Sequence, residues 1–255
     1  MDLFKTRLFI STALALVPIA ALAASSGNFA GTVSNQNCII DSGTGVQTGG
    51  QTSGSAGTVF PISTTPIQIQ VASGSGTALV ITPSAVTGLY TDNKLSTSGN
   101  STEDVGIQMQ VNISAAPGTA LKGPIQIAPS TTGDVANATD SGATCVDPAS
   151  GVASCVIYDQ HFIQISSTAL QQLAAAGGIA AGTTLFEQIQ STLSAHAFNF
   201  YVQVPNGGTY NVTAQGQLFV GKGNSTNGSI AGCFGPATLT VQQVQNFNFN
   251  TPLQF

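Results

Sequence analysis

The chain has 255 residues, of which only 6% are charged, and its formal net charge is −5 at pH 7. Ordinary soluble domains carry roughly 25% charged residues, and a total of five lysines and arginines is too few for nucleic-acid binding or polybasic attachment to a membrane surface. Hydrophobic residues make up 42% of the chain, which argues against disorder, so Gln, Asn, Ser and Thr must supply its solubility.

The first 23 residues have the pattern of a secretory signal peptide. Lys5 and Arg7 form a positive start, Leu8–Leu22 is apolar, and Ala21 and Ala23 provide a small-x-small cleavage site. An uncleaved membrane anchor is the alternative, but the apolar run is short for a bilayer span and Pro18 interrupts it. We therefore expect residues 1–23 to be removed. We expect residues 24–255 to form one domain without a transmembrane helix, secreted, periplasmic or at the cell surface.

The rest of the chain is dominated by short runs in which every second residue is apolar. A Gly- and Ser-rich segment at about 42–57 precedes them, and we expect it to be a flexible loop. The runs predict strands at Ile67–Val71, Ala78–Ile81, Ile107–Ile113, Ile125–Ile127, Val156–Ile165, Phe198–Val204, Tyr210–Val220 and Leu239–Val241, with a further run ending at Phe255. Turn residues at 73–76 and 206–208 predict two hairpins. Together these patterns predict an all-β fold, an antiparallel β-sandwich.

Two short helices are expected to interrupt the strands around residues 167–197. Thr168 and Gln171 form a capping box for a helix that ends at Ala176, before two glycines. Thr184 and Glu187 form a second capping box. The apolar face of this second helix would consist of Leu185, Ile189, Leu193 and Ala197, at four-residue steps. We expect the helix pair to cover an open end of the sandwich or an exposed sheet edge.

The four cysteines predict two disulfides, because an even number in an exported chain indicates oxidised pairs. Cys145 and Cys155 are favoured as one pair, since Pro148 and Gly151 make the segment between them prone to turn. Cys38 and Cys233 then pair with each other and tie the two ends of the domain together. The competing hypothesis is a zinc site, but the sequence has no C-x-x-C pair and its histidines lie elsewhere.

One hypothesis for catalysis and one for metal binding emerge from the polar residues. His161 lies two positions after Asp159, so the two share a strand face. They could act as a base and its orienting acid in a hydrolase, or simply form a polar strand face. There is no G-x-S-x-G motif, and we expect no enzyme activity. A calcium site is possible in a polar loop after Tyr90, where oxygen ligands cluster, and the alternative there is a solvated turn. The candidate ligands are Asp92, Asn93, Asn100, Glu103 and Asp104.

These observations favour an exported, non-enzymatic surface or extracellular protein that acts in adhesion or extracellular assembly. Its partners would be other surface proteins or further copies of itself, because unpaired edge strands can be donated or received between chains. One alternative is a soluble module that binds glycans or another ligand, with contacts from Tyr90, Tyr158, Tyr201 and Tyr210. Two others are a small outer-membrane β-barrel, suggested by the alternating aromatic C-terminal run, and a hydrolase that uses His161.

Overall fold

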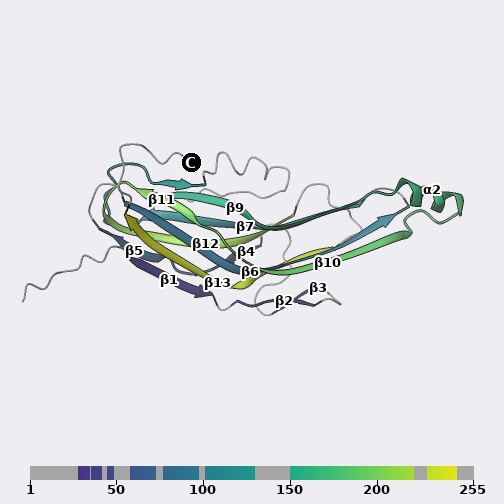
Figure 1. Ribbon diagram of the computed structural model, residues 1–255, viewed down its shortest axis with the longest axis horizontal. Helices are drawn as coiled ribbons and strands as arrows, with labels where there is room; N and C mark the ends of the chain where they lie inside the picture. Colours follow the sequence, from purple (N-terminus) through teal and green to yellow (C-terminus); the bar gives the residue numbers. More distant parts are fainter. Residues whose placement is uncertain are drawn as a thin grey trace, which may run out of the picture.

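The computed structural model describes residues 28–34, 36–41, 45–48, 58–72, 77–97, 101–129, 150–220 and 229–245. In these residues the chain forms two large antiparallel sheets packed against each other, a separate two-stranded sheet and one short helix (Figure 1). The all-β sandwich predicted from the alternating runs is therefore confirmed. The predicted signal peptide lies outside the described residues.

The first sheet has the strand order β1-β13-β6-β11-β8, and β10 also pairs with β6. Its strands are β1 (Phe29–Ser34), β6 (Thr77–Ser96), β8 (Gln126–Ala128), β10 (Thr184–Ala197), β11 (Phe200–Val204) and β13 (Ser229–Gln245). The second sheet has the order β4-β12-β7-β9, and β5 also pairs with β12. Its strands are β4 (Val59–Pro61), β5 (Ile67–Val71), β7 (Ser101–Ala115), β9 (Val152–Ile165) and β12 (Gly208–Val220).

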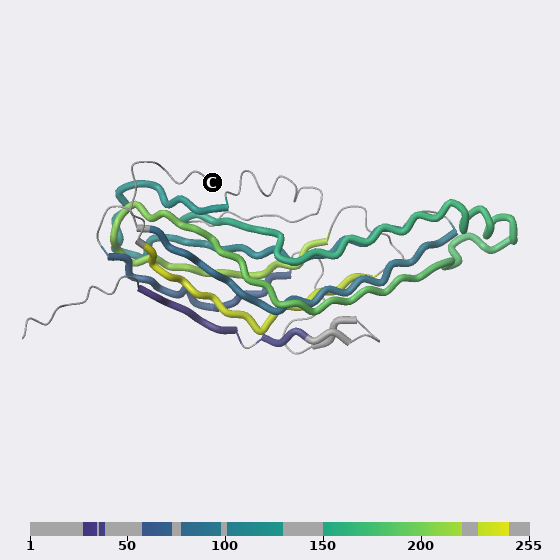
Figure 2. Tube along the Cα trace, in the orientation of Figure 1, coloured from purple at the N-terminus to yellow at the C-terminus, as the bar shows by residue number. Residues whose placement is uncertain are grey.

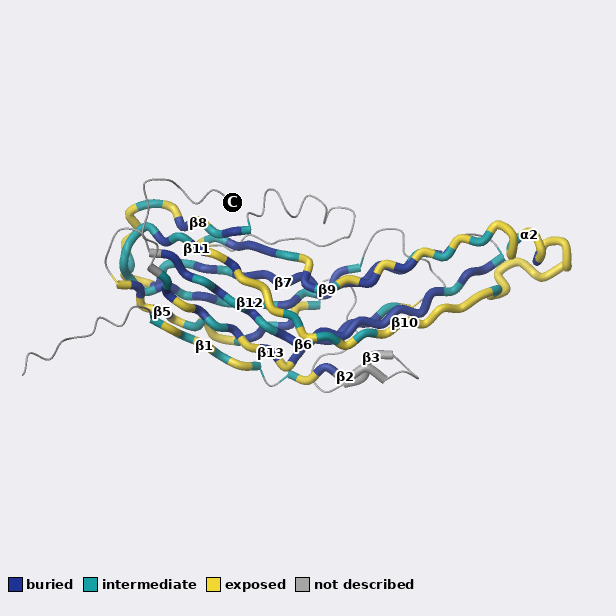
Figure 3. Tube along the Cα trace, viewed as in Figure 1, coloured by how far each residue is buried: buried dark blue, intermediate teal, exposed yellow. Residues whose placement is uncertain are grey.

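The core lies between the two sheets in the part of the molecule that we call the body. Alternation places it there: along β11, Phe200 and Val202 are fully buried whereas Tyr201 between them is 45% exposed. Figure 3 shows this buried region as dark blue segments on both sheets. The largest fully buried side chains of the body include Phe60, Leu79, Ile81, Met109, Phe200 and Tyr210.

Three long strands continue past the body and join β10 in an arm, which Figures 1 and 2 show extending to one side. The arm consists of residues 86–96 of β6, 101–107 of β7, 159–165 of β9 and the whole of β10, together with the start of β13. At its tip, β9 leads into helix α2 (Thr168–Ala176), and the chain returns along β10. The strands before and after the helix, β9 and β10, therefore both belong to the arm.

Helix α2 confirms the first of the two predicted helices. Its cap is one residue earlier than expected: the Ser167 hydroxyl accepts a hydrogen bond from the Leu170 amide at 3.2 Å. The helix ends at Ala176, as the sequence predicts, and Gly177 is its C-cap. With nine residues it is too short to cross a bilayer, and no other helix in the described ranges could do so.

The second predicted helix is wrong, because Thr184–Ala197 forms strand β10. The apolar residues repeat every four positions, and four is a multiple of the strand period of two, so this pattern suits one face of a strand as well as one face of a helix. The pairing of this segment with β6 decided in favour of the strand. Residues from Phe186 to Ala197 face β6 without a break in register, with Leu193 opposite Gly88.

Three smaller expectations also differ from the structure. Within the segment 42–57, residues Gly45–Thr48 form strand β3, which pairs with β2 (Cys38–Asp41). The turn at 206–208 joins β11 to β12, but these strands belong to opposite sheets and are not a hairpin. Strands β5 and β6 are likewise in opposite sheets. Turn chemistry is local, so it specifies a reversal of the chain without specifying the sheet that the next strand joins.

Candidate assembly surface on the arm

The arm begins at Tyr158, where a register shift interrupts the pairing of β7 with β9. The Tyr158 hydroxyl accepts a hydrogen bond from the Ala85 amide at 3.1 Å and donates one to the carbonyl of His196. Burial raises the pKa of this phenol to about 12, so it remains a donor at any physiological pH. One side chain of β9 therefore fixes both β6 and β10 at the base of the arm.

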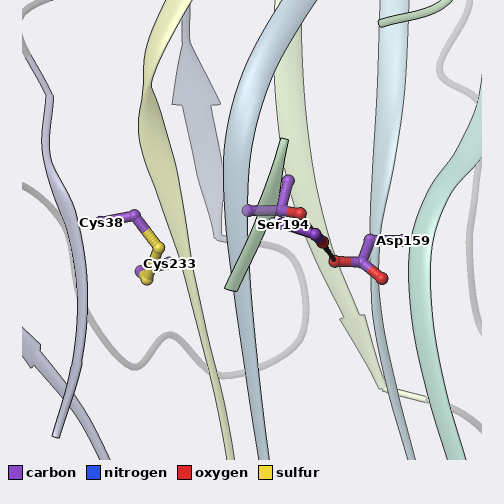
Figure 4. The surroundings of a disulfide bond; sticks show 5 residues. Cys38, Asp159, Ser194 and Cys233 are labelled. Atoms are coloured by element: carbon purple, nitrogen blue, oxygen red, sulfur yellow. Dashed lines mark hydrogen bonds between the residues drawn. A yellow bond between two sulfur atoms is a disulfide. The ribbon is translucent and has the colours of Figure 1, made fainter. Parts of the chain in front are cut away.

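A disulfide fastens the outer side of the arm base. Cys38 of β2 and Cys233 of β13 are bonded, which confirms the predicted pairing and joins residues that are 195 positions apart (Figure 4). Both cysteines are buried beside Tyr90 and Ala231. Cys155 is also disulfide-bonded, and its predicted partner Cys145 lies outside the described residues.

The interior of the arm contains buried polar side chains that link its two layers. Asn93 of β6 is fully buried, and its side-chain amide donates to the carbonyl of Ile163 in β9 at 3.2 Å. The Ser101 hydroxyl of β7 donates to the side-chain oxygen of Asn93. Each bond joins a strand of the first sheet to a strand of the second, so hydrogen bonds complement apolar contacts in holding the arm together.

Asp159 is the centre of a second set of links. Its Oδ2 accepts hydrogen bonds from the Thr87 hydroxyl at 2.6 Å and the Ser194 hydroxyl at 3.3 Å, and Figure 4 shows Ser194 and Asp159 pointing toward one another. The same oxygen lies 3.5 Å from Nε2 of His196. Asp159 therefore connects β9 to both β6 and β10 through charge-assisted bonds, which are stronger than neutral ones.

His161 also faces the interior, but it does not bond to Asp159. Its Nε2 lies 2.6 Å from the Thr192 hydroxyl of β10, and its Nδ1 is buried without a hydrogen-bond partner. Burial lowers the pKa of the His161 imidazole, and the nearby Asp159 carboxylate opposes that shift in part. A neutral ring that carries its proton on Nε2 fits this site, because Nδ1 then leaves no donor unsatisfied.

The polar cluster lacks the connectivity of a catalytic relay. In a Ser-His-Asp triad the serine and the carboxylate contact opposite nitrogens of the ring. Here a single atom, Nε2 of His196, lies 2.7 Å from the Ser194 hydroxyl and 3.5 Å from Asp159. His161 contacts Thr192 instead of an orienting acid. The arrangement is suited to joining strands.

Strand β10 forms an open edge along the arm. Among the described strands it pairs with β6 alone, so every second amide and carbonyl of its backbone points away from the sheet. Its side chains are also exposed: Phe186 is 46% accessible to solvent, Ile189 53% and Leu193 57%. Figure 3 shows this strand largely in yellow, beside the buried β6. Few native edges of this length present apolar side chains to water, because such edges pair with other chains.

Charge along this edge is low, and its one carboxylate is already paired. Glu187 is the sole ionisable acid or base of β10 apart from His196. Its carboxylate lies 3.1 Å from Nζ of Lys94, which is also 2.9 Å from Asp92. These two carboxylates raise the pKa of the lysine. The edge therefore offers an approaching strand little electrostatic repulsion.

Four of the five residues predicted as calcium ligands are described, and each consecutive pair among them is divided between the two faces of its strand. Asp92 and Asn93 are consecutive residues of β6, so their side chains point to opposite faces: Asp92 to Lys94, Asn93 into the arm. Glu103 and Asp104 are related in the same way in β7, and Asp104 accepts a hydrogen bond from Gln160. Asn100 lies outside the described residues. No three His, Cys, Asp or Glu side chains in the described ranges gather as a metal site would require.

The residues suggested for glycan binding are mostly internal. Tyr90, Tyr158 and Tyr210 are buried, and only Tyr201 is exposed. A shallow hollow of about 210 Å³ lies at the arm base, lined by residues that include Val86, Ala195 and Pro236. It is smaller than the roughly 300–1,000 Å³ of typical small-molecule sites. As a candidate binding surface, the exposed edge of β10 is therefore longer than either of these two features.

Comparison of the chain with protein-family models, with curated proteins and with solved structures found no match.

Proposed function

We propose that this chain is an exported, non-enzymatic surface or extracellular protein that acts in adhesion or extracellular assembly, by accepting a partner's strand at β10. One observation carries the proposal: β10 has 14 residues, pairs with β6 alone among the described strands, and exposes the apolar side chains of Phe186, Ile189 and Leu193. Strand addition to such an edge supplies main-chain hydrogen bonds for affinity and side-chain contacts for specificity.

Two properties of the arm support this proposal. The links from Asp159, Asn93 and Tyr158 hold the two layers together, so the edge is presented as a preformed strand, and the ordering cost of binding is small. The Cys38–Cys233 disulfide at the arm base is stable in oxidising compartments such as the cell exterior.

The test is to place lysines on the edge. Lysine on an edge strand prevents strand addition, because its charge must stay hydrated. We expect the double variant Ile189→Lys, Leu193→Lys to weaken association at least about tenfold in sedimentation velocity. It should also remove the protein from the sheared surface fraction of the host.

The matched control is Leu121→Lys, since Leu121 is an exposed apolar residue outside every strand. This variant should associate as the wild-type protein does. A wild-type chain that stays monomeric at all concentrations and never appears in the surface fraction would contradict the proposal.

A further inference from the structure

We propose that the partner strand is β10 of a second copy of this chain, paired antiparallel about a twofold axis at Ser191. This inference rests on the proposed function and names the partner that it leaves open. Twofold dimers use one surface patch twice, so that patch must be complementary to itself. The sequence and exposure of β10 meet this condition in one register.

The regularity of β10 distinguishes it from the other long edge of the arm. Among the described strands, β9 is also an edge strand of 14 residues, but a register shift interrupts its pairing between Ile107 and Gln108 of β7. Bulges of this kind twist an edge and hinder the addition of another strand. In β10 the register shift falls between Thr184 and Phe186, at the tip. The strand from Phe186 to His196 is free of such breaks, and Ser191 lies at its centre.

The Ser191 register brings the exposed apolar residues together. A continuous sheet needs opposed residues that share a face. With Ser191 opposite its own copy, Ile189 lies opposite Leu193 of the second copy, and symmetry repeats the pair. These are the two most exposed large apolar side chains of β10, at 53% and 57%, and directly opposed apolar pairs stabilise a sheet. On the other face, Phe186 lies opposite His196 of the second copy.

Charge and length favour the same register. Glu187 lies opposite Ala195 of the second copy, so no two carboxylates are opposed, and Lys94 remains beside Glu187. A pairing centred on Ile189 would restrict the regular overlap to residues 186–192. It would also place Leu193 opposite Leu185, where the strand is irregular. The Ser191 register uses the whole regular length of the edge.

The antiparallel direction has a consequence for the tip. Strand β10 runs from the tip of the arm to its base, so each tip comes alongside the arm base of the second copy. From residue 160 to residue 186 the chain has no Asp, Glu, Lys or Arg, and Leu173 and Ile179 are exposed at the tip. Exposed Phe198 and the apolar hollow beside Pro236 lie at the base. The two regions therefore meet without unpaired charges.

Cysteine cross-linking tests the register. Disulfides require Cα atoms about 4.4–6.8 Å apart, which directly opposed strand residues satisfy. We expect Ser191→Cys to give mostly covalent dimer after mild oxidation of the full chain. No described native cysteine is free. Ile189→Cys alone and Leu193→Cys alone should not cross-link, because each is about 13 Å along the strand from its own copy. A mixture of these two variants should form the mixed dimer.

The outcomes separate this inference from the proposed function. Cross-linking of Ser191→Cys and of the mixture, with neither single control reacting, supports the dimer. Absence of cross-linking at Ser191 overturns it, as does self-cross-linking of Ile189→Cys, which would indicate another register. If the lysine variant still weakens association in that case, a different partner strand occupies β10 and the proposed function stands. If the lysine variant has no effect, both fail.

Discussion

The body and the arm share the strands β6, β7, β9 and β13 but are held together differently. In the body, β6 contributes Leu79 and Ile81 to a core of fully buried apolar side chains. Further along, the same strand contributes Thr87 and Asn93, which are equally buried and hydrogen-bonded to β9. Burial of apolar area stabilises without regard to direction, whereas a buried polar group must find its partner or lose stability. The arm therefore adds specific bonds between its layers to apolar packing, whereas the body relies mainly on packing.

This difference has a functional consequence. If the interior of the arm were purely apolar, a large hydrophobic surface would be exposed whenever its two layers separated. Hydrogen-bonded links from Asp159 and Asn93 specify one arrangement of the two layers. They leave the apolar side chains of β10 directed outward, where a partner strand can bury them. Three changes would test how far the two regions differ.

The largest effect is expected from a truncation in the body. Phe200→Ala removes a fully buried ring, and we expect it to lower the free energy of unfolding by about 3–5 kcal/mol in urea titrations. The control is Phe162→Ala in the arm, where the ring is 61% exposed, which should change stability by less than about 0.5 kcal/mol. Similar losses in the two variants would show that exposed arm side chains share in the core.

A smaller and more local effect is expected from the arm interior. Thr87→Val keeps the side-chain shape but removes the 2.6 Å hydrogen bond to Asp159, at a cost of about 1.5–3 kcal/mol for a bond to a charged group. Hydrogen exchange should accelerate in β10 and the distal part of β9, and remain unchanged in β12. Thr240→Val in the body removes only a 3.4 Å bond to the Thr82 carbonyl and serves as the control. Uniform acceleration across both regions would contradict a separable arm.

The smallest effect concerns pH. Because burial lowers the pKa of His161 from its usual 6.5, the unfolded chain takes up a proton more readily than the folded arm. Stability from this site is therefore complete above pH 6.5 and falls as the pH drops below it. One proton limits the slope to about 1.4 kcal/mol per pH unit. Between pH 7 and 5.5, the free energy of unfolding from chemical denaturation should fall less steeply with decreasing pH for His161→Gln than for the wild type. Equal slopes would show that His161 titrates alike in both states.

Much of the body could be predicted because its strands have one apolar and one polar face. Alternation at Ile107–Ile113 and Phe200–Val204 is sufficient to place these residues in strands with a buried face. The arm was harder to predict, because part of its interior is polar. Polar residues such as Thr87, Asn93 and Ser101 are usually found at the surface. Here they are buried because they form hydrogen bonds with residues of other strands, which the sequence does not reveal. The one available signal was the spacing of Asp159 and His161, which correctly placed both on one face.

The sequence by itself determined the local properties of this protein: strand periodicity, the end of helix α2 and the scarcity of charge. Only the tertiary structure decided between strand and helix at 184–197, because apolar residues at four-residue steps satisfy both periods. It also decided which sheet follows each turn and which strand remains at the edge. These choices depend on long-range pairing, in this case of β10 with β6, and a local pattern carries no information about a partner almost a hundred residues away.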